Sequence, residues 1–597
     1  MPVLSRPRSA LLGALAACGL LVAGCTADPA PPGPSASAGP VELTAAVAAP
    51  RTSPLVIGTE DPVRTAIRIS TQLFEQSSLV VLAEPEAGAL ATASSLAVAA
   101  GVPLLVDGGP TGDDDPLPAE LDRLGVTHAI TVGDVRAHDD LSLTAVGDGD
   151  TLDALIAAGL TLTDAEPVSA DGLVEAVTAL DRPDTPVLTL TADDSASDDT
   201  ASDDPTPEPT FSVPSGWSAP EATPDDGAGS AALPGWPDDT EVAVDTTAPA
   251  HTAVLIDPTA DDDPIALVPA LATARAAGVP VVEVPGGDPR ASSETVQALT
   301  GVVSGLALGT GFGSTDQLAP RLEAAATGVE LPGGGQLVFP GGDGATGKKY
   351  IALYGTPGTP ALGVLGEQDV PATVARAEET ARGYRALTDD TVVPTLEIIA
   401  TVASGAPEAD GSYSRPRSIE DLRPLIEAAE DAGQAVVIDL QPGRTDFLTQ
   451  AQQYAELLEY PNVGLALDPE WRLKPDQVHL RQIGSVGVDE VNQVSDWLAQ
   501  FVRDRDLPQK MFLLHQFSLR MITERERLNT DHDELATIIH ADGQGGQPAK
   551  TGTWNTLRQG APEVHWGWKN FYDEDQPMLT PEQTYQVQPV PDLVTYQ

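Results

Sequence analysis

Residues 463–471 read VGLALDPEW, and this stretch decides how the C-terminal part of the chain is interpreted. An apolar run typical of a buried strand ends abruptly in Asp468 and Glu470, followed by a tryptophan. Residues two apart on an extended chain point to the same side, so we expect the two carboxyl groups to lie together and the pKa of one to rise towards neutral pH. Such a proton donor suits glycosidase chemistry. A structural interpretation stays open, because Asp-Pro often ends a strand and Glu470 can pair with Arg472 or Lys474.

Strands and helices alternate on both sides of this stretch, from residue 345 to residue 597, as in a TIM-type barrel. Seven strands are predicted, over residues 350–354, 393–400, 435–439, 463–467, 511–515, 536–540 and 564–568. No eighth strand can be placed from the sequence, and a helix is predicted over residues 520–529. In such a barrel the site lies at the carboxyl ends of the strands.

The predicted strand ends carry polar and aromatic side chains that would meet at one mouth. We expect the carboxylates at these ends to be catalytic, namely Glu397, Asp439, Asp468 and Glu470. We expect the other residues there to bind the substrate, namely Tyr354, His515, Gln516, His540, Asp542, Trp566 and Trp568. Histidines beside acidic residues also allow a metal site. No H-x-x-x-H or H-x-H spacing supports one, so we expect neither a metal nor a cofactor.

Aromatic residues are concentrated in the same region. All nine tyrosines and five of the seven tryptophans lie beyond residue 345. Rigid aromatic faces stack on sugar rings, although they are also ordinary core residues.

The barrel resembles glycoside hydrolase family 18, in which the fourth strand ends in D-x-D-x-E and a tryptophan of the last strand floors the sugar site. Here the fourth predicted strand ends in A-L-D-P-E. The resemblance implies that Glu470 is the proton donor and that Asp468 orients the acetamido group of the substrate. It also implies that Trp566 or Trp568 forms the floor.

The sequence departs from that family at two points. Ala466 replaces the first aspartate of the motif, and the Ser-x-Gly-Gly strand of the family has no counterpart. A different barrel glycosidase would use Glu470 as the acid with Asp439 or Glu397 as nucleophile or base, with an outcome set by the distance between the carboxyl groups. A barrel that has lost activity and only binds glycan is the other alternative.

The chain begins with a stretch typical of a secretory signal, which we assign to residues 1–24. Two arginines precede an apolar run that is too short to span a bilayer. The residues Val-Ala-Gly-Cys at 22–25 resemble the lipobox of bacterial lipoproteins, which implies that Cys25 carries lipid and tethers the protein to the membrane. Cys18 would leave with the signal, so no disulfide is expected. Residues 25–57 are assigned to the lipidated cysteine and a flexible linker.

Two regions before the barrel alternate short apolar strands with helices, the pattern of a doubly wound parallel sheet. The sequence AAGVPLLV at 99–106 returns as AAGVPVVEV at 276–284. We therefore predict a duplication, with one α/β unit over residues 58–190 and a second over residues 251–340.

These units resemble the cell-wall-binding repeat type 2 modules of Gram-positive surface proteins. The motifs are GALA at 88–91, GVPLLV at 101–106 and LGVTHAITVG at 124–133. The resemblance implies a non-catalytic module that associates with anionic wall polymers. Gly88 replaces the usual aspartate and the second unit is interrupted, so a generic doubly wound α/β domain is the alternative.

The interruption and the overall charge limit the possible partners. Residues 191–250 are rich in Asp, Pro, Ser and Thr and are predicted to form a disordered acidic insertion. The formal net charge of the chain is −56. This charge argues against nucleic acid as a partner, because phosphates would be repelled.

These patterns predict an α/β protein with duplicated doubly wound parallel-sheet units followed by a TIM-type barrel, anchored by lipid on the extracytoplasmic face of the cell membrane. The expected function is association with the cell wall and binding or hydrolysis of a wall or extracellular polysaccharide. The alternative is a non-catalytic cell-wall-binding or scaffold lipoprotein with an inactive barrel.

Overall fold

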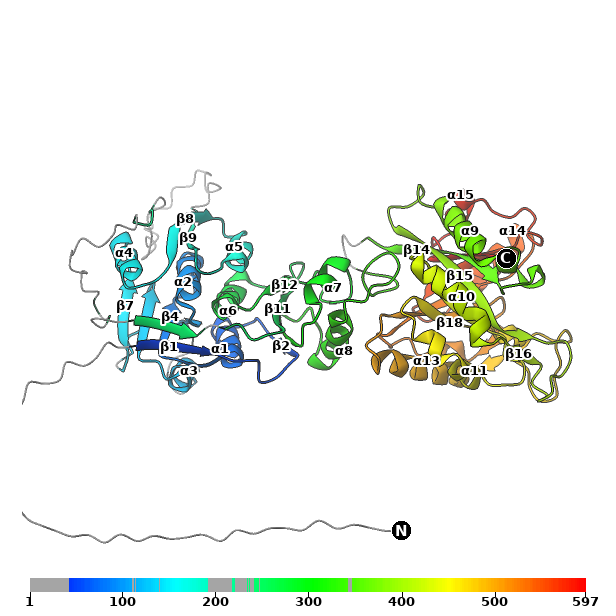
Figure 1. Ribbon diagram of the computed structural model, residues 1–597, viewed down its shortest axis with the longest axis horizontal. Helices are drawn as coiled ribbons and strands as arrows, with labels where there is room; N and C mark the ends of the chain where they lie inside the picture. Colours follow the sequence, from blue (N-terminus) through cyan, green and yellow to red (C-terminus); the bar gives the residue numbers. More distant parts are fainter. Residues whose placement is uncertain are drawn as a thin grey trace, which may run out of the picture.

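The computed structural model shows an N-terminal α/β region and a C-terminal barrel lying end to end (Figure 1). The structure describes residues 42–597, apart from 110–111, 113, 139, 192–216, 221–233, 235, 237–240, 246 and 342–345. The predicted signal, Cys25 and most of the predicted acidic insertion lie outside these residues. Among the described residues, no helix is both long and apolar enough to cross a membrane.

The first parallel sheet has the strand order β5-β4-β6-β7. Its central strand β4 consists of five buried residues, because helices cover both faces of the sheet. The elements are α1 (Pro62–Leu73), β4 (Leu79–Ala83), α2 (Ala87–Ala100), β5 (Leu104–Val106), α3 (Leu117–Leu124), β6 (His128–Val132) and β7 (Ser142–Val146). They are followed by α4 (Gly149–Ala157), β8 (Leu162–Val168), α5 (Leu173–Ala179) and β9 (Thr185–Leu190), in which β8 and β9 pair with each other.

The second parallel sheet has the order β12-β11-β13-β2. The strand β11, which is the first strand of the predicted second unit, lies between β12 and β13 just as β4 lies between β5 and β6, which agrees with the predicted duplication. Its elements are β11 (Thr252–Ile256), α6 (Pro264–Ala276), β12 (Val281–Glu283), α7 (Ser293–Leu299), β13 (Ser304–Leu308) and α8 (Thr315–Ala326).

Part of the predicted linker belongs to the fold. The strand β1 (Glu42–Val47) pairs with β3 (Phe74–Ser77) and with β10 (Glu241–Asp245), which itself lies inside the predicted acidic insertion. The strand β2 (Leu55–Ile57) forms an edge of the second sheet. Both strands carry apolar residues that join the core, so residues 42–47 and 55–57 belong to the folded part and not to a linker.

Eight parallel strands form a closed barrel, which is the predicted TIM-type architecture. Closure comes from β14, which pairs with both β15 and the last strand of the chain, β24. The strands are β14 (Lys348–Gly355), β15 (Thr391–Ala403), β17 (Ala435–Leu440), β18 (Val463–Leu467), β20 (Lys510–Gln516), β22 (Leu535–Ala541), β23 (His565–Asn570) and β24 (Leu593–Tyr596). The helices are α9 (Val370–Arg382), α10 (Ile419–Asp431), α11 (Phe447–Gln453), α12 (Ala455–Leu458), α13 (Val488–Arg503), α14 (Gln547–Arg558) and α15 (Pro581–Thr584).

Two predictions about the barrel need correction. The strand at 564–568 is the seventh and not the last, because β24 follows it. The predicted helix at 520–529 is absent from this described segment, which instead contains two short 3₁₀ turns, Leu519–Met521 and Arg525–Arg527, around the strand β21 (Ile522–Thr523).

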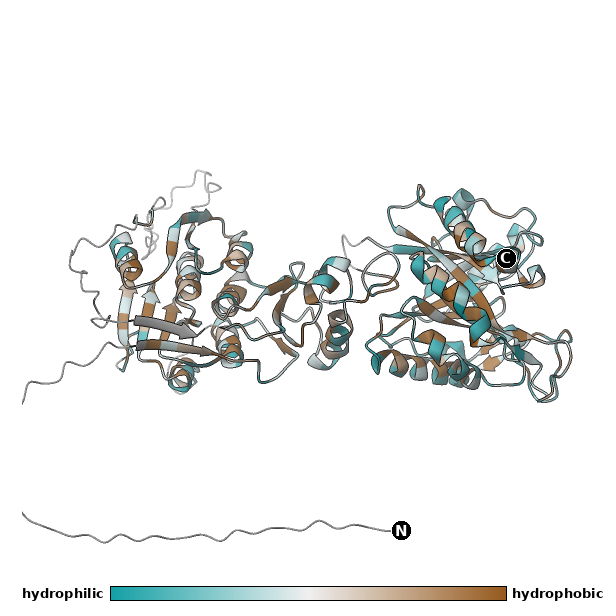
Figure 2. Cartoon of the chain, in the orientation of Figure 1, coloured by the Kyte–Doolittle hydropathy of each residue, from teal (hydrophilic) through white to brown (hydrophobic). Residues whose placement is uncertain are grey.

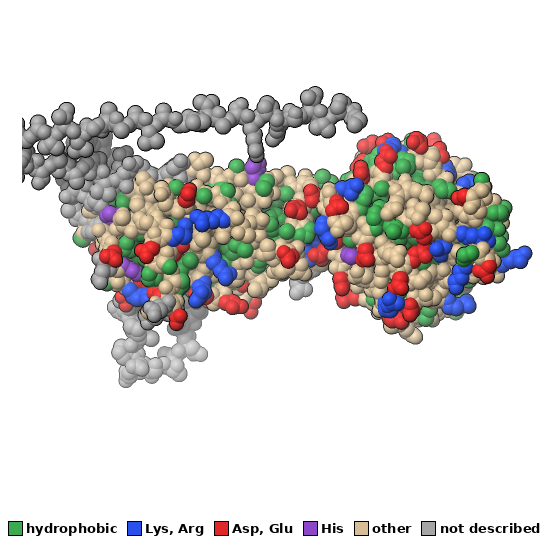
Figure 3. All heavy atoms as spheres, turned by 90° about the horizontal axis from the view of Figure 1, so that it is seen from below, with side chains coloured by type: hydrophobic (Ala, Val, Ile, Leu, Met, Phe, Trp, Pro, Cys, Tyr) green, Lys and Arg blue, Asp and Glu red, His purple; other side chains and the backbone are tan. Residues whose placement is uncertain are grey.

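Side chains alternate between the barrel interior and the surrounding helices along each strand. On β17, for example, Val437 belongs to the interior cluster whereas Val436 and Ile438 pack in the outer layer. Figure 2 shows the resulting apolar strands beneath helices whose outward faces are polar. On the face shown in Figure 3, acidic and basic side chains are interspersed over both parts of the molecule.

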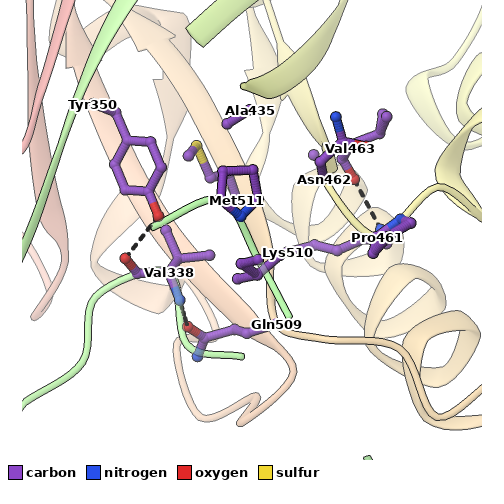
Figure 4. A pocket seen from close by; sticks show the side chains of 12 residues that line it. Val338, Tyr350, Ala435, Pro461, Asn462, Val463, Gln509, Lys510 and Met511 are labelled. Carbon is purple, nitrogen blue, oxygen red and sulfur yellow. Dashed lines mark hydrogen bonds between the residues drawn. The ribbon is translucent and has the colours of Figure 1, made fainter. Parts of the chain in front are cut away.

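Residues that precede β14 cover the amino-terminal end of the barrel, and Figure 4 shows one of them, Val338, beside Tyr350. Leu331 and Val338 are buried in the interior cluster with Tyr350. The Tyr350 hydroxyl donates to the Val338 carbonyl oxygen at 2.9 Å, and the Val338 amide donates to Oε1 of Gln509 at 3.0 Å. The site must therefore lie at the opposite, carboxyl end of the strands.

Candidate active site

A pocket of about 440 Å³ opens at the carboxyl ends of the barrel strands. Its lining combines carboxylates, a lysine, amides and aromatic rings. The residues are Tyr354, Ala361, Leu362, Ile399, Ala403, Gln441, Asp468, Glu470, Trp471, Phe517, Asp542, Gly543, Gln544, Thr553, Lys569, Phe571, Glu574 and Gln597. A second hollow of about 320 Å³ continues from Glu470 and Trp471 along the loop that contains Leu480.

Asp468 and Glu470 both line this pocket, but a turn brings them there instead of an extended strand. The strand β18 ends at Leu467, and residues Pro469–Trp471 form a 3₁₀ turn in which Asp468 accepts a hydrogen bond from the Glu470 amide at 3.3 Å. Gly484 donates its amide to the Glu470 carbonyl oxygen at 2.6 Å, and a Cβ at position 484 would lie only 2.5 Å from that oxygen. The close approach of this loop holds Glu470 at the mouth.

The environment of these two carboxyl groups favours their protonated forms. Burial, followed by the charge of Asp542, raises the pKa of Glu470 to about 7. Burial, followed by the charge of Glu470, raises the pKa of Asp468 well above its usual value. Arg472 does not pair with Glu470, as the structural interpretation of this stretch allowed. Its guanidinium group pairs with Glu490 at 2.9 Å instead.

A buried ionic network lies beneath the pocket and is centred on His515. Its Nε2 lies 2.6 Å from Oε1 of Glu397, and its Nδ1 lies 2.9 Å from Oδ2 of Asp542. Burial acts to lower the pKa of His515, but Glu397 and Asp542 outweigh burial and hold this pKa well above its usual value. Burial would raise the pKa of Glu397, yet His515 lowers it to about 2.

Two further predicted residues contact this network. The Tyr354 hydroxyl donates to Oδ2 of Asp439 at 2.8 Å, and the other Asp439 oxygen lies 3.9 Å from Nε2 of His515. Burial raises the pKa of Asp439 to about 6, against the opposing effect of His515. Glu397, Asp439 and His515 do not line the pocket themselves but contact residues that do.

His540 is fully buried beside His515, with ring centroids 4.8 Å apart. Burial lowers the pKa of His540 to about 3. The ring lies against β23 at Gly567, where an added Cβ would come within 2.8 Å of a ring carbon. A glycine at this position is therefore needed for His540 to occupy its place.

Three predicted site residues lie elsewhere. Trp566 and Trp568 face the outer layer, where both rings contact Trp554 of α14. Gln516 also points outward, and its Oε1 accepts a hydrogen bond from Arg525. The prediction that Trp566, Trp568 and Gln516 converge on the mouth is wrong, because each lies on the opposite face of its strand from the interior residues.

Lys569 and Trp471 are among the pocket residues that the sequence interpretation missed. Lys569 of β23 is buried, and its Nζ lies 3.6 Å from the centre of the Tyr354 ring. Trp471 lines both hollows and is half-buried. Lys569 and the two tryptophans lie on opposite faces of β23, but the sequence of this strand does not show which face points inward.

The fold and this site define a parallel α/β-barrel protein with an acidic pocket at the carboxyl ends of its strands. No protein-family model matches the chain, and no curated relative matches it. Among solved structures, the chain is similar to Cwp6 from Clostridium difficile at 15% sequence identity and a TM-score of 0.28. The match covers 65% of this chain and 63% of that chain, which is less than two thirds of the length of that chain.

Proposed function

We propose that the chain is a cell-surface hydrolase of a wall or extracellular polysaccharide, with Glu470 as the general acid. The observation that carries this proposal is the neutral-range pKa of Glu470 in a polar pocket at the carboxyl ends of the barrel strands. A carboxylic acid that stays protonated near pH 7 can give its proton to the leaving oxygen of a glycosidic bond.

Asp542 is the partner carboxylate in this proposal. Its side chain lines the same pocket, and among neighbouring charges it has the largest effect on the pKa of Glu470. It would act on a water molecule or on the sugar directly, depending on the distance between the two carboxyl groups when substrate is bound. Asp468 would orient the substrate and the turn that carries Glu470, and Trp471 would offer an aromatic face to a sugar ring.

The test uses the chain from residue 26 onward, which keeps every described residue. Purified peptidoglycan, chitin oligomers and a panel of bacterial glycans are incubated with this protein, with Glu470→Gln and with Glu379→Gln. Glu379 is an exposed residue of α9 that pairs with Arg382, so its variant is a matched control. We expect the control to keep full activity and Glu470→Gln to lose about 10²–10⁴-fold. An equally active Glu470→Gln would refute the role of Glu470.

A non-catalytic glycan-binding protein is the second candidate. It is favoured by the outward position of Trp566 and Trp568, which leaves the pocket without the tryptophan floor that the family 18 resemblance implies. If no glycan is hydrolysed but wall material is bound, and binding falls in Trp471→Ala, this candidate replaces the first.

Attachment to the cell surface is a separate part of the proposal and rests on the sequence alone. The lipobox-like residues 22–25 support a lipid anchor on Cys25, and the wall-binding-like motifs support association with wall polymers. Replacing Cys25 with Ser should move the protein from the membrane fraction to the soluble fraction. Retention in the membrane fraction would contradict the anchor.

A further inference from the structure

Side chains from four barrel strands meet in one buried space below the pocket. Glu397 of β15, His515 of β20 and His540 of β22 each offer a ligand atom, and these three atoms all lie within 4.8 Å of one another. Asp439 of β17 adds an oxygen 3.9 Å from Nε2 of His515. All four residues are at most 1% exposed. Imidazole nitrogens and carboxylate oxygens in this number are a ligand set that zinc takes in proteins.

Several atoms of this cluster lack hydrogen-bond partners within the described part of the chain. They are both ring nitrogens of His540 and Oδ1 of Asp439. A buried polar atom left without a partner costs about 1–3 kcal/mol. Unpartnered atoms on two strands that border the same space indicate a ligand that would satisfy them together.

The contact between Asp542 and His515 is the arrangement that orients a metal-bound histidine. Nδ1 of His515 donates to Oδ2 of Asp542 at 2.9 Å, so Nε2 is the nitrogen directed towards Glu397 and Asp439. Carboxylates in this position fix the ring and raise the basicity of the coordinating nitrogen.

The charges of the cluster also favour a divalent cation. Three carboxylates surround His515, those of Glu397, Asp439 and Asp542. Lys569, which lies over the Tyr354 ring, is a cation near these carboxylates. A divalent ion among the carboxylates would offset their negative charge, and uncompensated buried charge is costly.

We propose that Glu397, Asp439, His515 and His540 bind one Zn²⁺ through Oε1, Oδ1, Nε2 and Nδ1, with Asp542 as the residue that positions His515. The ion displaces the proton of Nε2, which passes to solvent. Donor atoms around a tetrahedral zinc ion are roughly 3.3 Å apart. Nε2 of His515 lies 2.6 Å from Oε1 of Glu397 and 3.9 Å from Oδ1 of Asp439, and Nδ1 of His540 lies 4.0 Å from the same Glu397 oxygen, so each of these separations is close to that spacing.

The site is tested by titrating the chain from residue 26 onward with Zn²⁺ by calorimetry and by measuring bound metal after dialysis. We expect one equivalent bound with a Kd below about 1 µM, and a higher melting temperature in the presence of zinc. Co²⁺ should give the visible absorption of a tetrahedral site with nitrogen ligands. Failure of the wild-type chain to bind one equivalent of Zn²⁺ would overturn the proposal.

Variants locate the site. His540→Asn should weaken Zn²⁺ binding at least about 100-fold, and Asp542→Asn about 10–100-fold. The matched control is His532→Asn, because His532 bonds to Asp496 outside the barrel and should leave binding unchanged. Circular dichroism shows whether each variant is folded, and Asp542→Asn decides the matter if His540→Asn is not. Unaltered binding in the folded variants would place the metal elsewhere.

The zinc site does not rest on the proposed hydrolase activity. Glu470 is not a ligand, so Glu470→Gln should keep the full zinc content whatever happens to its activity. If Glu470→Gln loses glycan hydrolysis and keeps its zinc, only the role of Glu470 is supported. If His540→Asn loses its zinc, the metal site is supported whether or not the protein hydrolyses glycan. The two proposals can therefore fail independently.

Discussion

Glu470 makes the stability of the fold depend on pH in a direction that can be measured. Its pKa is about 7 in the folded chain, raised by burial and then by Asp542, whereas an unfolded glutamate has a pKa of about 4.3. Between these values the folded state binds more protons than the unfolded state, so the free energy of unfolding falls as pH rises. As the pH is raised from about 5 to about 8, we expect the free energy of unfolding to fall less in Glu470→Gln than in the wild type.

Urea unfolding at these two pH values measures the effect. Glu379→Gln should show the same pH dependence as the wild type, because Glu379 is exposed on the outer helix α9. Any hydrolysis should also decline above about pH 7 as Glu470 loses its proton. If Glu470→Gln loses as much stability as the wild type over this range, its carboxyl group is not the one that titrates.

Gly567 sets the position of the His540 ring, and a single methyl group should disturb it. A Cβ at residue 567 would lie 2.8 Å from a ring carbon of His540. We expect Gly567→Ala to lower the free energy of unfolding by about 1–3 kcal/mol, because the added methyl group would overlap the buried ring. Gly88→Ala is the control, since the space around Gly88 in α2 is open and alanine favours a helix. Equal stability of the two variants would contradict this account of the site.

The geometry of strands explains which site residues could be predicted from the sequence. Residues at strand ends converge in any parallel barrel, so Glu397, Asp439, His515 and His540 meet as expected. The inward or outward direction of a side chain depends on register, which the sequence of β23 left ambiguous because it carries polar and aromatic residues on both faces.

The possible metal ligands had no local motif for a related reason. Local motifs place ligands a few residues apart on one helix or loop. Here Glu397, His515 and His540 come from three different strands, and only closure of the barrel brings them together.

At the scale of elements, the outward tryptophans and Trp471 should respond differently to substitution. Trp568 is 2% exposed and packs with Trp554 of α14, which attaches that helix to β23. We expect Trp568→Ala to cost about 3–5 kcal/mol. Trp471 is half-buried at the mouth, so Trp471→Ala should cost less stability but weaken glycan binding. Chemical unfolding measures the stability of the two variants, and wall-binding assays measure their affinity. If only Trp471→Ala is strongly destabilised, then Trp471 and not Trp568 has the packing role.

The barrel strands were predictable where an apolar run was long and bounded by polar residues. The strand β24 escaped because its four residues follow a proline-rich segment and make no long apolar run. Its partners β14 and β23 nevertheless require it, since without β24 both would expose an unpaired edge. The helix predicted at 520–529 does not form. A charged side chain of this segment, Arg525, is directed instead towards β20, where it donates a hydrogen bond to Gln516.

At the scale of the whole molecule, the α/β region and the barrel are joined by more than the connecting segment. Arg321 of the second unit bonds to the Asp533 carboxylate at 2.5 Å, and Arg290 donates to the Asp533 carbonyl oxygen at 3.1 Å. Contacts of this kind depend on residues more than 200 positions apart, so neither local pattern nor composition could reveal them.

The same junction shifts the boundary of the barrel towards the N-terminus. Composition placed the boundary at residue 345. However, Leu331 and Val338 fill the amino-terminal end of the barrel, and the Val338 carbonyl oxygen accepts a hydrogen bond from the Tyr350 hydroxyl. A fragment of residues 346–597 would expose this interior and leave that hydroxyl without its acceptor. We expect the fragment 330–597 to be more stable by at least about 3 kcal/mol.

Urea unfolding of the two fragments measures this difference, and the paired substitution Leu331→Ala with Val338→Ala in the longer fragment isolates its cause. That variant should fall between the two fragments, because the backbone acceptor for Tyr350 remains while the buried side chains are shortened. Equal stability of the fragments would mean that the segment only covers a barrel that is complete without it. A clear difference would mean that the barrel core is finished by residues the chain supplies before its first barrel strand.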